Sequence, residues 1–170
     1  RWRDQNNRFS ANIFSSDVDN LIAYDAALGA PGNVNAAKIQ GLEFQLDSTL
    51  KAWRIGAALT LLSAVQDGGT HDGKELPRRP GEFLELRVDR AFTKASAGVS
   101  LYSSGSTYDD LANTVVIQSY TTLDLRGTYH LTANWHAVGK LTNLTDEDYE
   151  NASYYRQPGR QFFVGLKWMQ

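Results

Sequence analysis

The connections between the predicted strands of this chain alternate between short and long along its whole length. Tight turns are expected at about 50–53, 92–95 and 131–133, and long polar loops at about 26–36, 67–80, 105–118 and 145–158. All four prolines fall in those long loops, as expected because proline removes a ladder hydrogen bond: Pro31, Pro77, Pro80 and Pro158. A sheet with tight turns at one rim and long loops at the other is typical of β-barrels that span the outer membrane.

The predicted strands are apolar on one face and polar on the other. The clearest is at about 120–131, where Leu123, Leu125 and Tyr129 alternate with Asp124 and Arg126, and successive residues of a strand point to opposite faces. The same alternation recurs at about 9–24, 42–46, 53–61, 84–88, 97–101, 133–143 and 159–169, where only Phe163 departs from it. This pattern predicts an all-β protein of about eight antiparallel strands, most of them near the ~9–11 residues that cross a bilayer when tilted.

The polar face carries many charged residues, which are Glu43, Asp47, Glu85, Arg87, Asp89, Asp124, Arg126 and Lys140. Burying such charges without partners costs several kcal/mol per ion, so we expect this face to line a lumen that is filled with water or plugged. A soluble sandwich with its charged faces outward is the alternative explanation of the same alternation.

Two finer expectations follow from the strand assignments. If the turn near Thr132 is centred on that residue, Asp124 lies directly opposite Lys140, and this pair contributes roughly 0.2–1 kcal/mol. Near the short-turn rim, four aromatic residues are expected to point outward as an interface girdle: Trp53, Tyr129, Trp135 and Trp168.

Composition and motifs favour no other class of function. The net charge is -2 without a basic stripe, so no nucleic-acid partner is expected. The chain has no cysteine, and His71, His130 and His136 are not at metal-ligand spacing, so neither a metal site nor a cofactor is expected. The acidic run Asp146-Glu147-Asp148 lacks the spacing of a calcium loop. A glycine-framed nucleophile is also absent from the sequence, so we do not expect an enzyme.

Several segments resemble TonB-dependent outer-membrane receptors. The segment 141–150 (LTNLTDEDYE), then Tyr155 and 158–162 (PGRQF), is similar to the C-terminal signature of that family. Gly41 and Glu43 resemble the inward Gly-x-Glu of a family strand. Within the family, 76–79 (LPRR) and 105–109 (GSTYD) are closest to the cobalamin (vitamin B12) receptors.

The resemblance implies a fold larger than this chain. Family members form a transmembrane barrel of about 22 strands with an N-terminal plug and a TonB box, the short segment that pairs with TonB. Residues 1–170 would be the C-terminal barrel portion, located in the cell outer membrane. The chain opens Arg1-Trp2-Arg3-Asp4 without an initiator Met or an apolar leader, and we therefore expect a piece of a longer protein.

The resemblance also implies a function and a site. It implies active transport of cobalamin or a similar bulky ligand, with the TonB complex, the lipid bilayer and the barrel assembly machinery as partners. The family's ligand-contacting positions fall near Lys74 and Thr107, although relatives usually have arginine at the second position. The expected ligand-binding residues are Lys74, Thr107, Tyr108 and Asp109, in the long loops 67–80 and 105–118.

Three alternatives remain open at this point. The first is a receptor for a siderophore or another TonB-dependent ligand. The second is a structural outer-membrane barrel of about eight strands that is complete in itself, with an interior filled by side chains. The third is an outer-membrane enzyme barrel such as a lipase or protease, which would need a catalytic group at the outer rim.

Overall fold

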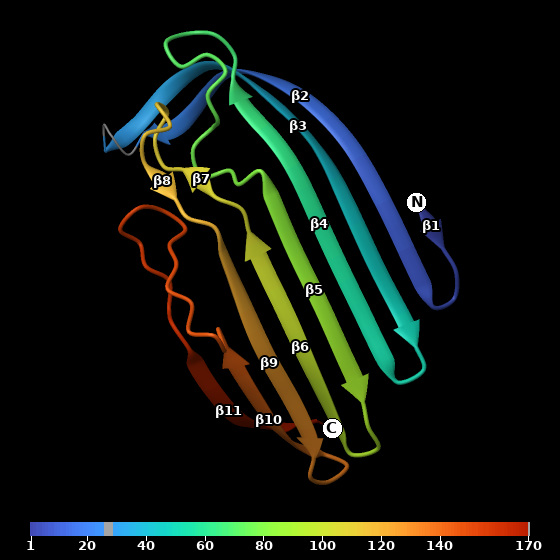
Figure 1. Cartoon of the computed structure of the whole chain (residues 1–170). Helices are drawn as coiled ribbons and strands as arrows, with labels where there is room; N and C mark the ends of the chain where they lie inside the picture. The colour runs from blue at the N-terminus through green and yellow to red at the C-terminus, as the bar shows by residue number, and fades with distance from the viewer. Residues whose placement is uncertain (26–28, 170) are drawn as a thin grey trace.

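The computed structural model describes residues 1–25 and 29–169, and this described part consists of strands, turns and loops. Nine strands form one antiparallel sheet, in the order β1-β2-β3-β4-β5-β6-β9-β10-β11 (Figure 1). They are β1 (Trp2–Arg3), β2 (Asn7–Asp25), β3 (Ala30–Leu50), β4 (Trp53–Gln66), β5 (Glu82–Ala91), β6 (Ala95–Ser104), β9 (Tyr120–His130), β10 (Trp135–Thr142) and β11 (Gln161–Trp168). The short strands β7 (Thr107–Tyr108) and β8 (Val116–Ile117) pair separately. Because the sheet ends at β1 and β11, it is open rather than a closed barrel.

The two ends of the sheet differ as the sequence predicts. The turns that join β3 to β4, β5 to β6 and β9 to β10 lie at one rim, and the long connections lie at the other (Figure 1). The predicted loops 67–80, 105–118 and 145–158 fall between strands, although 105–118 contains the short strands β7 and β8. Among the described residues, no helix has the length and apolar character needed to cross a membrane.

The predicted loop at 26–36 is wrong for residues 30–36, which belong to β3; residues 26–28 lie outside the described part. Strand β4 ends at Gln66, which pairs with Ala37, and the next residue, Asp67, still donates its N–H to the Ala36 carbonyl, so residues 30–34 have ladder partners only in β2. Pro31 therefore lies within a strand, opposite Tyr24. An edge segment tolerates proline because only one side of its ladder is hydrogen-bonded, and this explains why the expectation that every proline lies in a loop fails here.

The far part of the β2–β3 hairpin bends over the long-loop end of the sheet (Figure 1). Ala37, Ala64, Leu76 and Leu111 form the buried apolar cluster there, and Leu21 and Ala23 of β2 are among the partly buried residues that pack against it. The cluster joins the hairpin to the loops 67–80 and 105–118. The principal apolar cluster of the described residues therefore fixes the long loops.

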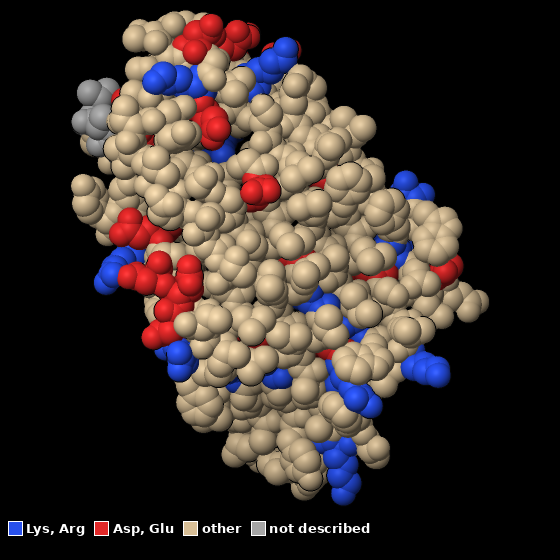
Figure 2. Space-filling view, in the orientation of Figure 1, with Lys and Arg blue, Asp and Glu red and all other residues tan. Residues whose placement is uncertain are grey.

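The apolar face of the sheet remains exposed. Directly opposed residues form continuous apolar rows across it, such as the row Leu46, Ala57, Leu86, Leu101 and Leu123. Ile13 is 85% exposed, Phe162 is 74% exposed and Leu166 is 68% exposed. Figure 2 shows a surface in which uncharged residues predominate. An apolar surface of this extent requires a cover, and lipid supplies that cover in a membrane barrel.

The polar face carries charge pairs that reach across the strands. Arg126 donates to both carboxylate oxygens of Asp89, at 2.9 and 2.7 Å. These two residues lie in one row, on either side of Gly98. Arg87 lies 3.5 Å from Glu85 and 3.9 Å from Asp47, and Gly56 separates Arg87 from Asp47 in the row. The charged lumenal face predicted from the sequence is thus present as a network of paired side chains.

The predicted register of Asp124 and Lys140 is wrong by two residues. Lys140 pairs with Arg126, because the β9–β10 turn is centred on residue 133 rather than on Thr132. Asp124 and Lys140 nevertheless share a face, and Lys140 Nζ lies 3.4 Å from Asp124 Oδ2 along a diagonal. The ion pair forms because a lysine side chain is long enough to reach a diagonal neighbour.

The four aromatic residues expected at the short-turn rim lie on the apolar face. Trp135 pairs directly with Trp168, and Tyr129 lies opposite Ala137 on the neighbouring strand. Trp53 begins β4, with the Arg90 guanidinium 4.9 Å from its ring centroid. All four are at least 40% exposed, as an aromatic belt at a membrane interface requires.

Candidate functional site

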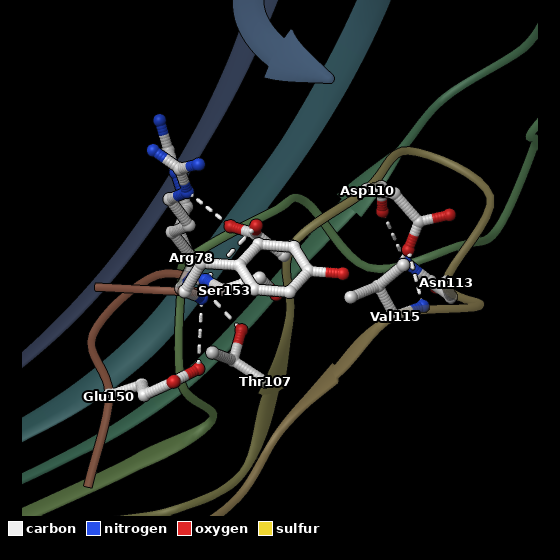
Figure 3. A network of polar contacts seen from close by, with 10 residues as sticks. Arg78, Thr107, Asp110, Asn113, Val115, Glu150 and Ser153 are labelled. Atoms are coloured by element: carbon white, nitrogen blue, oxygen red, sulfur yellow. Dashed lines mark hydrogen bonds and ion pairs between the residues drawn. The ribbon is translucent and has the colours of Figure 1, made fainter. Parts of the chain in front are cut away.

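The long loops are joined by two buried carboxylates, Asp109 and Asp110. Both lie just after β7, and they are 1% and 0% exposed respectively. Buried carboxylates are stable only when they are hydrogen-bonded or paired. Their partners therefore define how the loops are held (Figure 3).

Asp110 closes its own loop. Its Oδ1 accepts from the backbone N–H groups of Thr114 and Val115, each at 2.8 Å, and its Oδ2 accepts from Thr114 Oγ1 at 2.8 Å. Burial raises the pKa of Asp110, but the hydrogen bonds from Val115 and Thr114 outweigh burial and hold the pKa below its ordinary value. Asp110 is therefore an ionised anchor of the loop 105–118.

Asp109 connects three separate parts of the chain. It forms an ion pair with Arg78 of the loop 67–80, and its Oδ2 accepts the N–H of Ser153 at 3.2 Å. The Arg78 guanidinium also lies 4.5 Å from the ring centroid of Tyr24, a residue of β2. Asp109 and Arg78 thus join the three long loops 67–80, 105–118 and 145–158 to the overhanging β2–β3 hairpin.

Further hydrogen bonds tie the loop 67–80 to the loop 105–118. Asn113 accepts the N–H of Glu75 at 2.8 Å and donates to the Glu75 carbonyl at 3.0 Å. Gln66 donates to the Leu111 carbonyl at 2.8 Å, and Lys74 donates to the Ala112 carbonyl. The outer end of the sheet therefore carries a preorganised loop assembly.

The structure brings the four predicted ligand residues into this one assembly but places them differently. Lys74 is exposed and Tyr108 is half-buried, so both present surface to solvent. Thr107 is buried and accepts the Arg79 N–H at 3.1 Å through its hydroxyl. Asp109 is buried in the contacts described above. The first pair is accessible at the surface of the assembly, although Lys74 also donates to the Ala112 carbonyl, and the second pair is buried in contacts that hold the loops.

The histidines lie outside this assembly or at its edge. His130 and His136 are directly opposed on β9 and β10, with ring centroids 4.6 Å apart, whereas His71 belongs to the loop 67–80. Within the described residues, both ring nitrogens of His136 are buried without a hydrogen-bond partner. Groups of three or more metal-ligating side chains are not found among the described residues.

Sequence reasoning missed a row of aromatic side chains below the loops. Tyr149 stacks on Tyr120 at 4.1 Å, and Tyr120 lies 6.3 Å from Tyr102, which contacts Phe83 edge-on at 4.5 Å. Tyr102 directly follows Leu101 of the apolar face, so the strand alternation places Tyr102 on the polar face. Its neighbours in the row come from three other segments, so only the tertiary structure brings them together.

Comparison with known proteins decides which family has this architecture. The family described as "TonB dependent receptor-like, beta-barrel" matches residues 1–144. The chain belongs to the TonB-dependent receptor family. Its homologues are outer-membrane proteins, which agrees with the exposed apolar face and the aromatic girdle of this sheet.

Individual TonB-dependent receptors resemble the chain at modest identity. A protein named vitamin B12 transporter BtuB, from Photobacterium profundum, is 30% identical over 163 residues, which is 92% of this chain and 26% of that protein. A probable TonB-dependent siderophore receptor, PiuA from Acinetobacter baumannii, is 24% identical over 89% of this chain and 22% of that protein. The chain thus spans about a quarter of the length of these curated relatives.

Solved structures show the same fold. The crystal structure of the siderophore receptor PiuA from Acinetobacter baumannii superposes with a TM-score of 0.83 at 21% identity, over 98% of this chain and 26% of that one. The sheet described here therefore has the architecture of part of a TonB-dependent receptor barrel.

Proposed function

We propose that the protein containing this chain is an outer-membrane receptor that takes up cobalamin by TonB-dependent active transport. The observation that carries the proposal is the 30% identity to a vitamin B12 transporter over 92% of the chain. Residues 1–170 would form the C-terminal part of its barrel, and strands outside this chain would pair with the open edges at β1 and β11.

In this proposal the substrate binds on the loop assembly at the outer rim. Lys74 and Tyr108 contact it, while Thr107 and Asp109 hold the loops in the binding geometry. Energy delivered through the TonB complex then displaces a plug, and the substrate crosses along the paired charges of the polar face. The chain performs no covalent chemistry, and its partners are lipid, the TonB complex and the barrel assembly machinery.

A siderophore receptor is the second candidate. The relative named as a probable siderophore receptor is 24% identical over 89% of the chain, and the fold likeness to the solved PiuA structure is high. A barrel of about eight strands complete in itself has less support, because β1 and β11 do not pair in the described sheet.

The proposal is tested with the full-length receptor in whole cells by measuring binding of radiolabelled cyanocobalamin. We expect Lys74→Gln to lower the affinity roughly 5- to 20-fold, which corresponds to the loss of about one charge-assisted hydrogen bond. Lys51→Gln, in the β3–β4 turn at the opposite rim, is the matched control and should bind like wild type. A wild-type receptor that binds no cobalamin, or equal affinities for both variants, would contradict the assignment.

A further inference from the structure

An arginine lies on the apolar face of the sheet, near the short-turn rim. Arg90 of β5 is directly opposite Trp53 of β4 and Ala97 of β6, so its side chain leaves the sheet on the face that carries the apolar rows. The strand residues that surround it on this face are uncharged, and they are Leu50, Trp53, Ile55, Val88, Ala97 and Val99. A charged residue on a lipid-facing surface is costly unless it lies near the membrane interface or pairs with another group.

Two aromatic rings hold the Arg90 guanidinium. Its Cζ atom lies 4.9 Å from the ring centroid of Trp53 and 4.8 Å from that of Phe92. Phe92 follows Arg90 by two residues, and it therefore emerges on the same side of the chain. These cation–π contacts stabilise the cation and restrict its long side chain without forming a hydrogen bond. The guanidinium is thus held within the aromatic girdle of the short-turn rim.

The N–H donors of Arg90 remain available to an external acceptor. Arg90 is exposed, and its side chain has neither an ion pair nor a hydrogen bond with any residue in the described part of the chain. Its acidic neighbour in the chain, Asp89, points to the opposite face, where Arg126 donates to both of its carboxylate oxygens. The five donors of the guanidinium fork therefore lack an acceptor within the described chain.

The surroundings of Arg90 favour the phosphate of a lipid as that acceptor. The planar fork can donate to two phosphate oxygens at once. Lys94, which is exposed in the turn after β5, adds positive charge at the same rim. Basic side chains also appear at the lower end of Figure 2, where the short turns lie in Figure 1. Ile55 and Val88, one row deeper on the same face, offer an apolar surface to acyl chains.

We propose that Arg90, Trp53 and Phe92 form a binding site for the headgroup of an anionic phospholipid in the leaflet at the short-turn rim. Arg90 donates to the phosphate, and the two rings keep its guanidinium in place. Lys94 favours a headgroup with a net negative charge over a zwitterionic one. The occupant is a lipid rather than free phosphate because the cation lies within a continuous apolar surface. This site is independent of the transported substrate, since it lies on the face opposite the lumenal charges.

Native mass spectrometry of the purified full-length receptor in detergent counts bound lipids and measures their affinities. The probes are dioleoylphosphatidylglycerol, which is anionic, dioleoylphosphatidylcholine, which is zwitterionic, and inorganic phosphate as a competitor without acyl chains. Wild type should bind phosphatidylglycerol about fivefold more tightly than phosphatidylcholine. An excess of inorganic phosphate should leave phosphatidylglycerol bound.

Variants of Arg90 separate its charge from its fork. Arg90→Gln removes both, so we expect it to weaken phosphatidylglycerol binding about fivefold. Arg90→Lys keeps the charge without the fork and should recover only part of that affinity. Arg54→Gln is the matched control, because Arg54 is on the polar face near the same rim, opposite Asp89, and this variant should bind the lipid like wild type. Compact mobility in unheated gel samples checks that each variant is folded.

Four results would contradict parts of this site or all of it. Equal phosphatidylglycerol affinities for wild type, Arg90→Gln and Arg54→Gln would remove Arg90 from lipid binding. Equal affinities of wild type for the two lipids would overturn the selection of an anionic headgroup. Displacement of the lipid by inorganic phosphate would make a free anion the occupant instead. Full affinity in Arg90→Lys would overturn recognition by the fork.

Discussion

Gly98 allows the ion pair between Asp89 and Arg126 to form across an intervening strand. The three residues lie in one row on β5, β6 and β9, and the pair spans the glycine. A Cβ built on Gly98 would lie 2.1 Å from Asp89 Oδ1 and 2.8 Å from Arg126 Nε. Gly98→Ala must therefore displace both side chains.

The expected cost follows from what the pair contributes. Asp89 and Arg126 share two charge-assisted hydrogen bonds, and such bonds contribute about 1.5–3 kcal/mol each where they are shielded. Because their side chains are 38% and 35% exposed, solvent screening reduces that contribution. We expect Gly98→Ala to lower the free energy of unfolding by about 1–2 kcal/mol, which is roughly a 5- to 30-fold change in the folded-to-unfolded ratio.

Urea unfolding of the purified full-length receptor in detergent, followed by tryptophan fluorescence, measures this cost. Gly127→Ala is the matched control, because a Cβ there meets only the Ser96 carbonyl, at 3.7 Å. In an Asp89→Asn, Arg126→Gln background the cost of Gly98→Ala should shrink. Equal midpoints for Gly98→Ala and Gly127→Ala in the otherwise wild-type receptor would refute the argument.

Two further predictions concern the loops and the β2–β3 hairpin. Asp110→Asn should make the loop 105–118 more sensitive to added protease at neutral pH. The pKa of Asp110 is lowered in the folded state, so the ionised carboxylate stabilises the loop above the ordinary carboxyl pKa, and this stabilisation is lost as the pH falls through the lowered pKa. Wild type and variant should therefore be cleaved at similar rates in acid. Unequal cleavage that persists in acid would contradict this. Gly41→Ala should reduce the yield of folded receptor, measured as the fraction that keeps its compact mobility in unheated gel samples, because a Cβ would lie 2.5 Å from the Phe14 ring and 2.9 Å from the Leu61 carbonyl oxygen. A normal folded fraction would show that the backbone can relax at this position.

The site could be predicted only in part from the sequence. The loops that carry Lys74, Thr107, Tyr108 and Asp109 are recognisable from their motifs, and the structure gathers these residues in one assembly. The burial of Thr107 and Asp109 is not recognisable from the sequence. Asp109, for example, lies among partners 31 and 44 residues away in the chain, Arg78 and Ser153. Strand periodicity gives no information about contacts between loops.

The sequence by itself determined the two faces of the sheet and its alternating rims, because strand period and turn chemistry are local properties. The family was recognisable from motifs such as those at 141–150 and 158–162. The tertiary structure decided what depends on register and on distant segments. The strand register places Arg126, and not the expected Asp124, directly opposite Lys140. An unpaired strand edge allows Pro31 to lie within β3. The aromatic row and the ion pair across Gly98 also depend on which strands become neighbours. Cross-strand geometry, which no single segment encodes, therefore sets how the side chains of the polar face are paired.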